Sequence, residues 1–147
     1  MDNATNLATA NTLVKRDANG RAQVAIPGSA DDIANKGYID DNFSKLNISI
    51  VSKTADYTLT LSDNNKLISM SSTSALTLTV PLNSSVTFPV GAQILIYQAN
   101  TGQITVSPAS GVTIISTSTN KMTSMRYAVA GLIKTATNTW VLFGDLV

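Results

Sequence analysis

The sequence predicts a mainly β protein, with an N-terminal hairpin and short helix followed by an antiparallel β-sandwich or jelly-roll-like domain. Three observations predict this class. Short runs of alternating apolar residues recur at roughly 8–12-residue spacing in the second half of the chain. An Asn-Gly pair separates two strand-like runs near the N-terminus. Between these regions, apolar residues follow a helical spacing.

The N-terminal hairpin is predicted from residues 12–16 and 21–26, which form its two arms. Asn19 and Gly20 lie in the connection between them. Both residues tolerate the positive φ that a tight hairpin turn needs. After the second arm, Ser29 fits a helix N-cap with Asp32 three positions further on. Gly37 either ends this helix or kinks it.

An apolar stripe on a helix is predicted after Gly37. Its members are separated by four, three and four positions: Ile39, Phe43, Leu46 and Ile50. The stripe covers about two heptads, which is shorter than a free-standing coiled coil needs. It must therefore pack either on its own domain or against copies of itself in an oligomer.

Eight strands are predicted in the second half of the chain. They cover residues 57–61, 66–70, 76–80, 93–97, 103–107, 112–115, 126–134 and 139–143. The last strand is apolar on both faces, because Trp140 and Leu142 alternate with Val141 and Phe143. This pattern fits a strand buried on two sides, by the core and by a neighbouring subunit.

We expect the chain to divide into a segment of residues 1–50 and a β-domain of residues 51–147, and its charges are unevenly placed. No charged residue occurs between Leu67 and Asn120. This window is rich in Ser, Thr, Val, Ile and Leu, which fit a pleated surface. Two interpretations of it stay open: a surface that faces other protein, or a Ser/Thr-rich surface in water.

The composition argues against an enzyme. The chain has no His and no Cys, and all nine acidic residues are Asp. It therefore has neither the commonest general base nor thiolate ligands for zinc. We expect no catalytic, cofactor-binding or metal site. The net charge of +1 argues against nucleic acid as a partner. Apolar runs too short to cross a bilayer argue against membrane insertion.

Saccharide binding is the second function class that the residues allow. Aromatic rings stack on sugar rings, and four residues offer them: Tyr57, Tyr97, Tyr127 and Trp140. Trp140 lies in an apolar run, which favours a core position for it. Polar loops at residues 83–85, 100–102 and 116–120 are further surface candidates, although ordinary loops have the same composition.

The N-terminal residues resemble a segment of tailed-bacteriophage fibre proteins. Residues 11–21 (NTLVKRDANGR) and 32–40 (DIANKGYID) match a paired pattern, "LVxRDxNGR" followed by "DIANKxYVD". The resemblance covers about residues 6–46. The later segments LTVP, FPVGAQI and WVLFGDL are similar to fibre-tip or head-fibre β-domains, a less specific match.

The resemblance implies a homotrimer on the surface of the virion, with an N-terminal part docked to a capsid or other virion protein and a β-knob pointing outward. The expected attachment residues are Leu13, Val14, Arg16, Asn19, Gly20 and Arg21. The expected trimer interface is the apolar stripe of Ile39, Phe43, Leu46 and Ile50. No shaft repeat separates the two parts, which favours a head fibre or capsid decoration over a tail fibre. The alternative is a tail-tip adhesin that binds a host surface glycan or receptor.

Overall fold

The computed structural model describes residues 4–5, 13–14, 18–20, 26–28, 34–37, 39 and 47–147. The chain divides into two compact units, Met1–Asn47 and Ile48–Val147. The second unit is called the β-domain. It is mainly β, as the strand-like runs predict.

In the N-terminal unit, two short strands pair in parallel. They are β1 (Ala4–Thr5) and β2 (Leu13–Val14), with Ala4 opposite Leu13. A turn follows at residues 18–20, where Gly20 has a φ of 76°. The predicted Asn-Gly turn is therefore present. The described partner of β2 is β1, and residues 21–25 of the predicted second arm lie outside the described residues.

A helical turn covers the position where Gly37 was expected to end or kink a helix. The Ile39 N–H donates to the Asn35 carbonyl at 3.1 Å, so Gly37 lies inside this turn. Phe43 and Leu46 lie outside the described residues. Ile50 belongs to a strand, so the predicted helical stripe does not extend to it. Ladder pairing of Ile50 with Leu67 fixes the extended conformation at this end.

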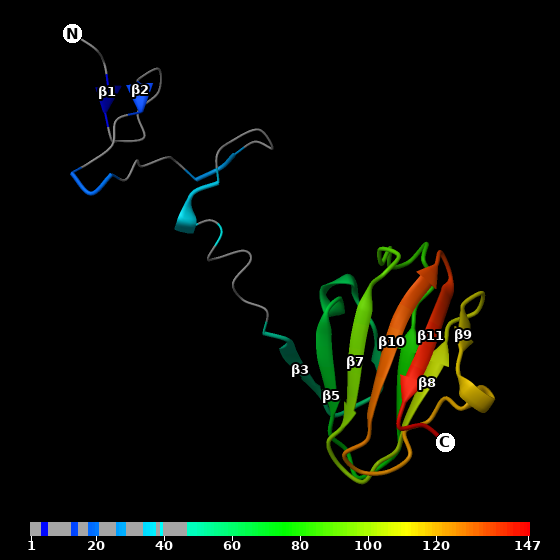
Figure 1. Ribbon diagram of the computed structural model, residues 1–147. Coiled ribbons are helices and arrows are strands. Elements are labelled where there is room, and N and C mark those ends of the chain that lie inside the picture. Colours follow the sequence, from blue (N-terminus) through cyan, green and yellow to red (C-terminus); the bar gives the residue numbers. More distant parts are fainter. Residues whose placement is uncertain are drawn as a thin grey trace. The chain divides into compact units, whose positions relative to one another are not determined.

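The β-domain contains a six-stranded sheet, called here the large sheet. Its spatial order is β3-β5-β7-β10-β11-β9 (Figure 1). The strands are β3 (Ser49–Lys53), β5 (Lys66–Met70), β7 (Gln93–Gln98), β9 (Thr113–Ile115), β10 (Val129–Ala136) and β11 (Thr139–Gly144).

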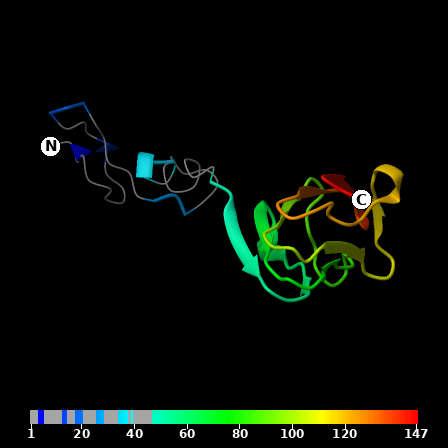
Figure 2. The same ribbon diagram turned by 90° about the horizontal axis from the view of Figure 1, so that it is seen from below.

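A three-stranded sheet, called the small sheet, forms the second layer (Figure 2). Its order is β4-β6-β8, from β4 (Tyr57–Thr58), β6 (Leu76–Val80) and β8 (Ile104–Pro108). Two short 3₁₀ helices, Leu61–Asp63 and Thr117–Thr119, lie in the connections. From β3 to β8 the chain alternates between the two sheets, so each winding places one strand in each layer.

The expected antiparallel pairing is wrong for most of the β-domain. Antiparallel pairs join β10 to β7 and to β11. The pairs β3–β5, β5–β7, β4–β6, β6–β8 and β11–β9 are parallel. Successive windings run in the same direction, so strands stacked within one sheet are parallel. Short strands with short connections do not reveal this, because neighbours in sequence enter opposite sheets.

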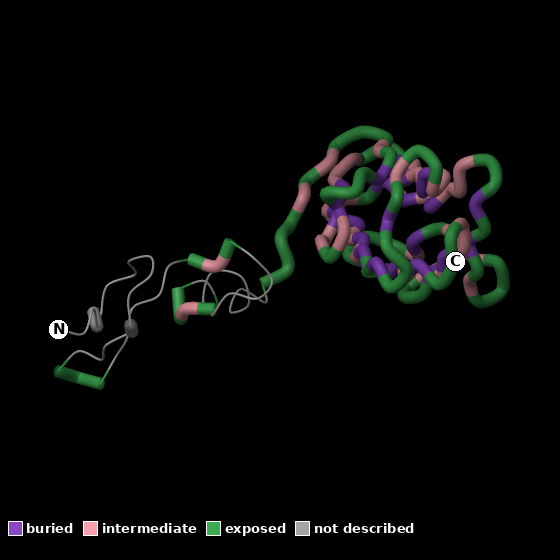
Figure 3. The backbone as a smooth tube through the Cα atoms, turned by 90° about the horizontal axis from the view of Figure 1, so that it is seen from above, coloured by how far each residue is buried: buried purple, intermediate pink, exposed green. Residues whose placement is uncertain are grey.

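One apolar core fills the space between the two sheets. Ile68, Ile96 and Leu132 of the large sheet and Leu78 and Val106 of the small sheet are completely buried in it. All of its buried members lie between Leu59 and Leu142. Among the described residues, the buried positions lie in the β-domain (Figure 3). The β-domain therefore holds its own core, as an independently folding domain does.

The connection before β5 departs from the predicted strand at 57–61. Strand β4 covers only Tyr57–Thr58, and Asp63 is buried in the 3₁₀ helix that follows. Asp63 Oδ2 accepts hydrogen bonds from the Tyr57 hydroxyl at 2.8 Å and from the Thr60 N–H at 2.8 Å. Local side-chain bonding to the backbone ends the strand here.

Candidate functional surface

The outer face of the large sheet is apolar, although it lies on the side away from the core. Alternation along β7 buries Ile94 and Ile96 and turns Leu95 and Tyr97 outward. The same alternation in β11 buries Trp140 and Leu142 and leaves Phe143 48% exposed. The predicted two-sided apolar character of this last strand is therefore present, with one side in the core.

Register aligns the outward residues of five strands in one row, called here the apolar row. Its members are Ile50, Leu67, Leu95, Gly131 and Phe143, each opposite the next. A second row continues the face with Ile133, Val141 and Ile115. Several of these side chains lie in solvent in the single chain, with Ile50 66% and Ile115 53% exposed. Contiguous exposed apolar surface of this kind marks interaction sites.

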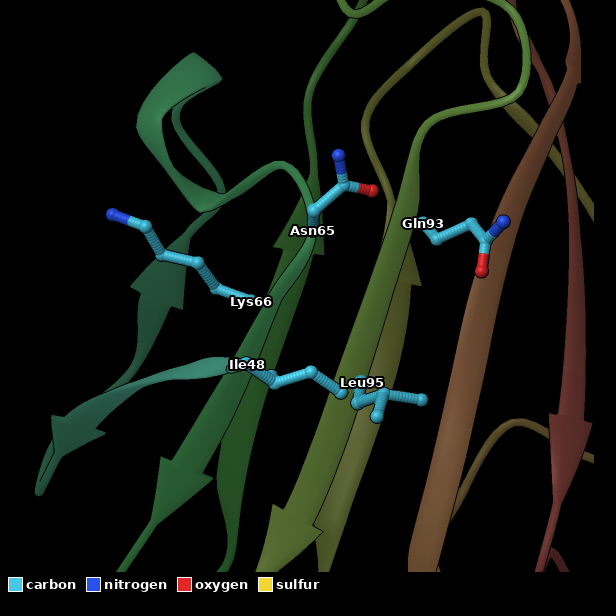
Figure 4. Close-up of a pocket in the computed structure, with 5 residues that line it drawn as sticks. All are labelled: Ile48, Asn65, Lys66, Gln93 and Leu95. Carbon is cyan, nitrogen blue, oxygen red and sulfur yellow. The ribbon is translucent and has the colours of Figure 1, made fainter. Parts of the chain in front are cut away.

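Gly131 shapes the centre of the apolar row. A Cβ at this position would lie 2.4 Å from Phe143 Cζ, so the phenyl ring covers the space that the glycine leaves. The ring thereby covers the Gly131 position as well as its own. Beside it, Ile48, Leu95, Asn65, Lys66 and Gln93 line a shallow hollow of about 190 Å³. The Ile48 side chain points toward Leu95 in this hollow (Figure 4).

The outer face of the small sheet has the opposite character. Thr77 pairs with Thr105, and Thr79 pairs with Ser107, so hydroxyl groups line this face. Their neighbours in the strands, such as Leu78 and Val106, point into the core. The two interpretations of the uncharged window thus apply to different faces: a Ser/Thr surface on the small sheet and an apolar surface on the large sheet.

A second candidate site lies at one end of the large sheet, around two tyrosines. The rings of Tyr97 and Tyr127 stack with centroids 6.4 Å apart and planes 15° apart. The Arg126 guanidinium carbon lies 4.6 Å from the centre of the Tyr127 ring. Tyr127 is 58% exposed and has a φ of 73°. A positive φ is strained for an aromatic residue, and such strain concentrates at functional sites.

A hollow of about 290 Å³ accompanies these tyrosines. Ser124, Met125, Arg126, Tyr127, Ala128 and Asp145 line it. The Asp145 carboxylate accepts a hydrogen bond from the Val129 N–H at 3.3 Å. A guanidinium, a carboxylate and a phenol at one exposed site offer the polar groups that sugar hydroxyls bind.

The other two aromatic candidates serve the structure. Trp140 is 1% exposed and meets Phe88 edge to face, with centroids 5.4 Å apart. The preference for a core position is confirmed. Tyr57 donates to Asp63, and Lys53 Nζ lies 3.7 Å from the centre of its ring.

Lys134 is a buried cation that the sequence reasoning missed. It is 2% exposed, and its Nζ donates to the Asn83 side-chain oxygen and to the Phe88 carbonyl, the latter at 2.6 Å. Burial lowers the pKa of Lys134 from its ordinary value of 10.5. In the sequence Lys134 only follows an apolar run, which does not indicate burial. In the structure it pairs with Trp140 of the neighbouring strand.

We expect stability to rise with pH because of Lys134. Between its lowered pKa in the folded state and 10.5, the unfolded chain binds more protons than the folded chain. The desolvation penalty is therefore fully present below the folded pKa and fades as pH approaches 10.5. Thermal unfolding at stepped pH should show this rise in the wild type, and Lys134→Met should flatten it. Lys121→Met, at a half-buried lysine, is the control and should keep the slope.

The predicted attachment residues are only partly described. Leu13 and Val14 form β2, and Asn19 and Gly20 lie exposed in the turn that follows. Arg16 and Arg21 lie outside the described residues. Within the described ranges, no group of three or more His, Cys, Asp or Glu residues could hold a metal ion. No helix in the described part of the chain is long and apolar enough to span a membrane.

Comparison of the chain with protein families, with characterised proteins and with solved structures gives no match.

Proposed function

We propose that this chain is a structural protein of a bacteriophage particle, namely a homotrimeric short fibre or decoration protein. Its N-terminal part anchors it to the particle, and its β-domain points outward. The observation that carries this proposal is the paired motif at residues 11–21 and 32–40, which resembles the attachment segment of phage fibre proteins.

The division of the chain supports separate roles for its two parts. The motif lies entirely in the unit Met1–Asn47, whereas the apolar core lies entirely in the unit Ile48–Val147. An outward domain can then fold by itself, because its core contains no described residue of the first unit. The head surface is the preferred location, since no internal repeat forms a shaft between the two parts.

A tail-tip adhesin is the second candidate function. The exposed and strained Tyr127, with Tyr97 and Arg126 beside it, favours this alternative. Such a site would bind a sugar weakly, and three copies in a trimer would raise the affinity by avidity.

The test removes residues 1–36 from the chain and supplies the truncated protein to particles that lack the native one. We expect the truncated chain to fold and to stay off the particles, while the full chain is incorporated. Mass spectrometry of purified particles measures incorporation. Incorporation of the truncated chain at the wild-type level would contradict attachment through the motif.

Adsorption separates the two candidate functions. Particles without the protein should form and adsorb to host cells at the normal rate if it decorates the head. Intact particles that fail to adsorb would favour the adhesin. In that case Tyr127→Ala should reproduce the adsorption defect, and Tyr57→Phe, which keeps its ring at a structural site, should not.

A further inference from the structure

We propose that the outer face of the large sheet is the contact between β-domains, where three copies pack the apolar row against one another around a common axis. This inference rests on the proposed trimer and assigns the surface that forms it within the β-domain. Ile50 belongs to the predicted trimer stripe, but the structure places it on this sheet face and not on a helix.

The contrast between the two outer faces is the first argument. Both faces lie on the outside of the same domain, yet they carry different residue types. The small sheet carries Thr77, Thr79, Thr105 and Ser107 outward, as a water-facing sheet does. Across its middle the large sheet carries Leu67, Leu95, Val141 and Phe143 outward instead, and its outward Ser, Thr and Gln residues lie toward the strand ends. A sheet that is apolar on both faces is typically covered on both.

The absence of charge argues for a second copy as the occupant. The outward strand positions of the large sheet hold no charged residue, from Ile50 in β3 to Ile115 in β9. When identical faces meet, like charges would repel one another, so an uncharged face suits self-association. The nearest charged groups border the face: Lys66 lines the hollow beside Leu95, and Arg126 lies over the Tyr127 ring.

The area of the face is too small for a whole standard interface, so a second segment is expected to contribute to the contact. Six strands at about 4.8 Å spacing give a width of about 24 Å, and five residues at about 3.3 Å give a length of about 17 Å. The footprint of about 400 Å² is about half of what one partner contributes to a standard interface. Ile50 of the predicted stripe lies on this face, and the other three members of the stripe precede the β-domain in the sequence. We therefore expect both segments to contribute to assembly.

Charge insertion on the full chain tests the proposal. Phe143→Asp and Ile115→Asp each place a carboxylate on the outer face, at half-exposed positions distant in sequence from the stripe. Thr79→Asp adds the same charge to the outer face of the small sheet and is the matched control. Sedimentation equilibrium over a dilution series measures the assembly, and circular dichroism checks that each variant is folded.

We expect the wild type and Thr79→Asp to be trimers, and both face variants to be folded and to dissociate at concentrations at least about a hundredfold higher. Two folded face variants that assemble as tightly as Thr79→Asp would overturn the assignment of this face and leave the trimer standing. A wild type that stays monomeric at tens of micromolar would overturn the trimer as well. Particle incorporation is measured separately, so its failure affects the proposed location and not this interface.

Discussion

Trp140→Ala should reduce the free energy of unfolding of the β-domain by about 3–5 kcal/mol. The indole is 1% exposed and lies against Phe88 in the core, so its removal leaves a cavity that the neighbouring strands cannot close. Lys134 Nζ also lies 6.0 Å from the centre of the ring and would lose that aromatic neighbour. Denaturant unfolding at a fixed protein concentration measures the effect, because association adds to apparent stability.

Trp140→Phe is the control for this prediction. It keeps an aromatic ring against Phe88 and should lose clearly less than the alanine variant. If Trp140→Ala stayed within about 0.5 kcal/mol of the wild type, as surface substitutions do, the indole would have to lie outside the core. That result would favour a saccharide-stacking role for Trp140.

Gly102→Ala is also expected to destabilise the β-domain strongly, with a loss of about 3 kcal/mol, the upper end of the range for overpacking. A Cβ at Gly102 would lie 2.0 Å from the Ser74 carbonyl oxygen and 2.7 Å from the Ser72 carbonyl oxygen. Both are backbone atoms, and the Gly102 N–H donates to the Ser72 carbonyl at 2.8 Å. The added methyl group must therefore push two segments apart or break their hydrogen bond.

The matched control is Gly37→Ala in the N-terminal unit. There a Cβ would lie 3.4 Å from Asn35 Oδ1, an ordinary contact. Alanine in a helical turn loses less chain entropy on folding than glycine, so this variant should be neutral or slightly stabilising. Thermal unfolding of both variants measures the difference. Equal unfolding temperatures for Gly102→Ala and the wild type would contradict this prediction. They would mean that the segments at Gly102 and at residues 72–74 move apart without loss of stability.

Most strand positions in the second half were predictable from the sequence. The runs at 66–70 and 76–80 match β5 and β6, and the second of them is defined locally by its alternation. A turn at Thr137-Asn138 joins β10 to β11, between the predicted strands at 126–134 and 139–143. β3 was not predicted, because Ile50 follows Leu46 by four positions and this spacing is typical of a helix.

The strand partners were not predictable from the sequence, and the candidate surface depends on them. The alternation in 139–143 correctly predicted two apolar faces for the last strand. Nothing in the sequence connected Phe143 with Leu67 or Ile50, which are far away along the chain. Their alignment arises from the parallel register of β3, β5 and β7, and from the antiparallel pairs of β10.

The sequence by itself determined the mainly β class, the approximate strand positions, the lack of histidine and thiol chemistry, and the resemblance of residues 6–46 to phage fibre segments. Each of these depends on local pattern or composition. Only the tertiary structure decided that the strands pair mostly in parallel, that Lys134 is buried, and that one outer face is apolar and the other hydroxylated. These features depend on which distant strands become neighbours, and that choice is made by packing of the whole core.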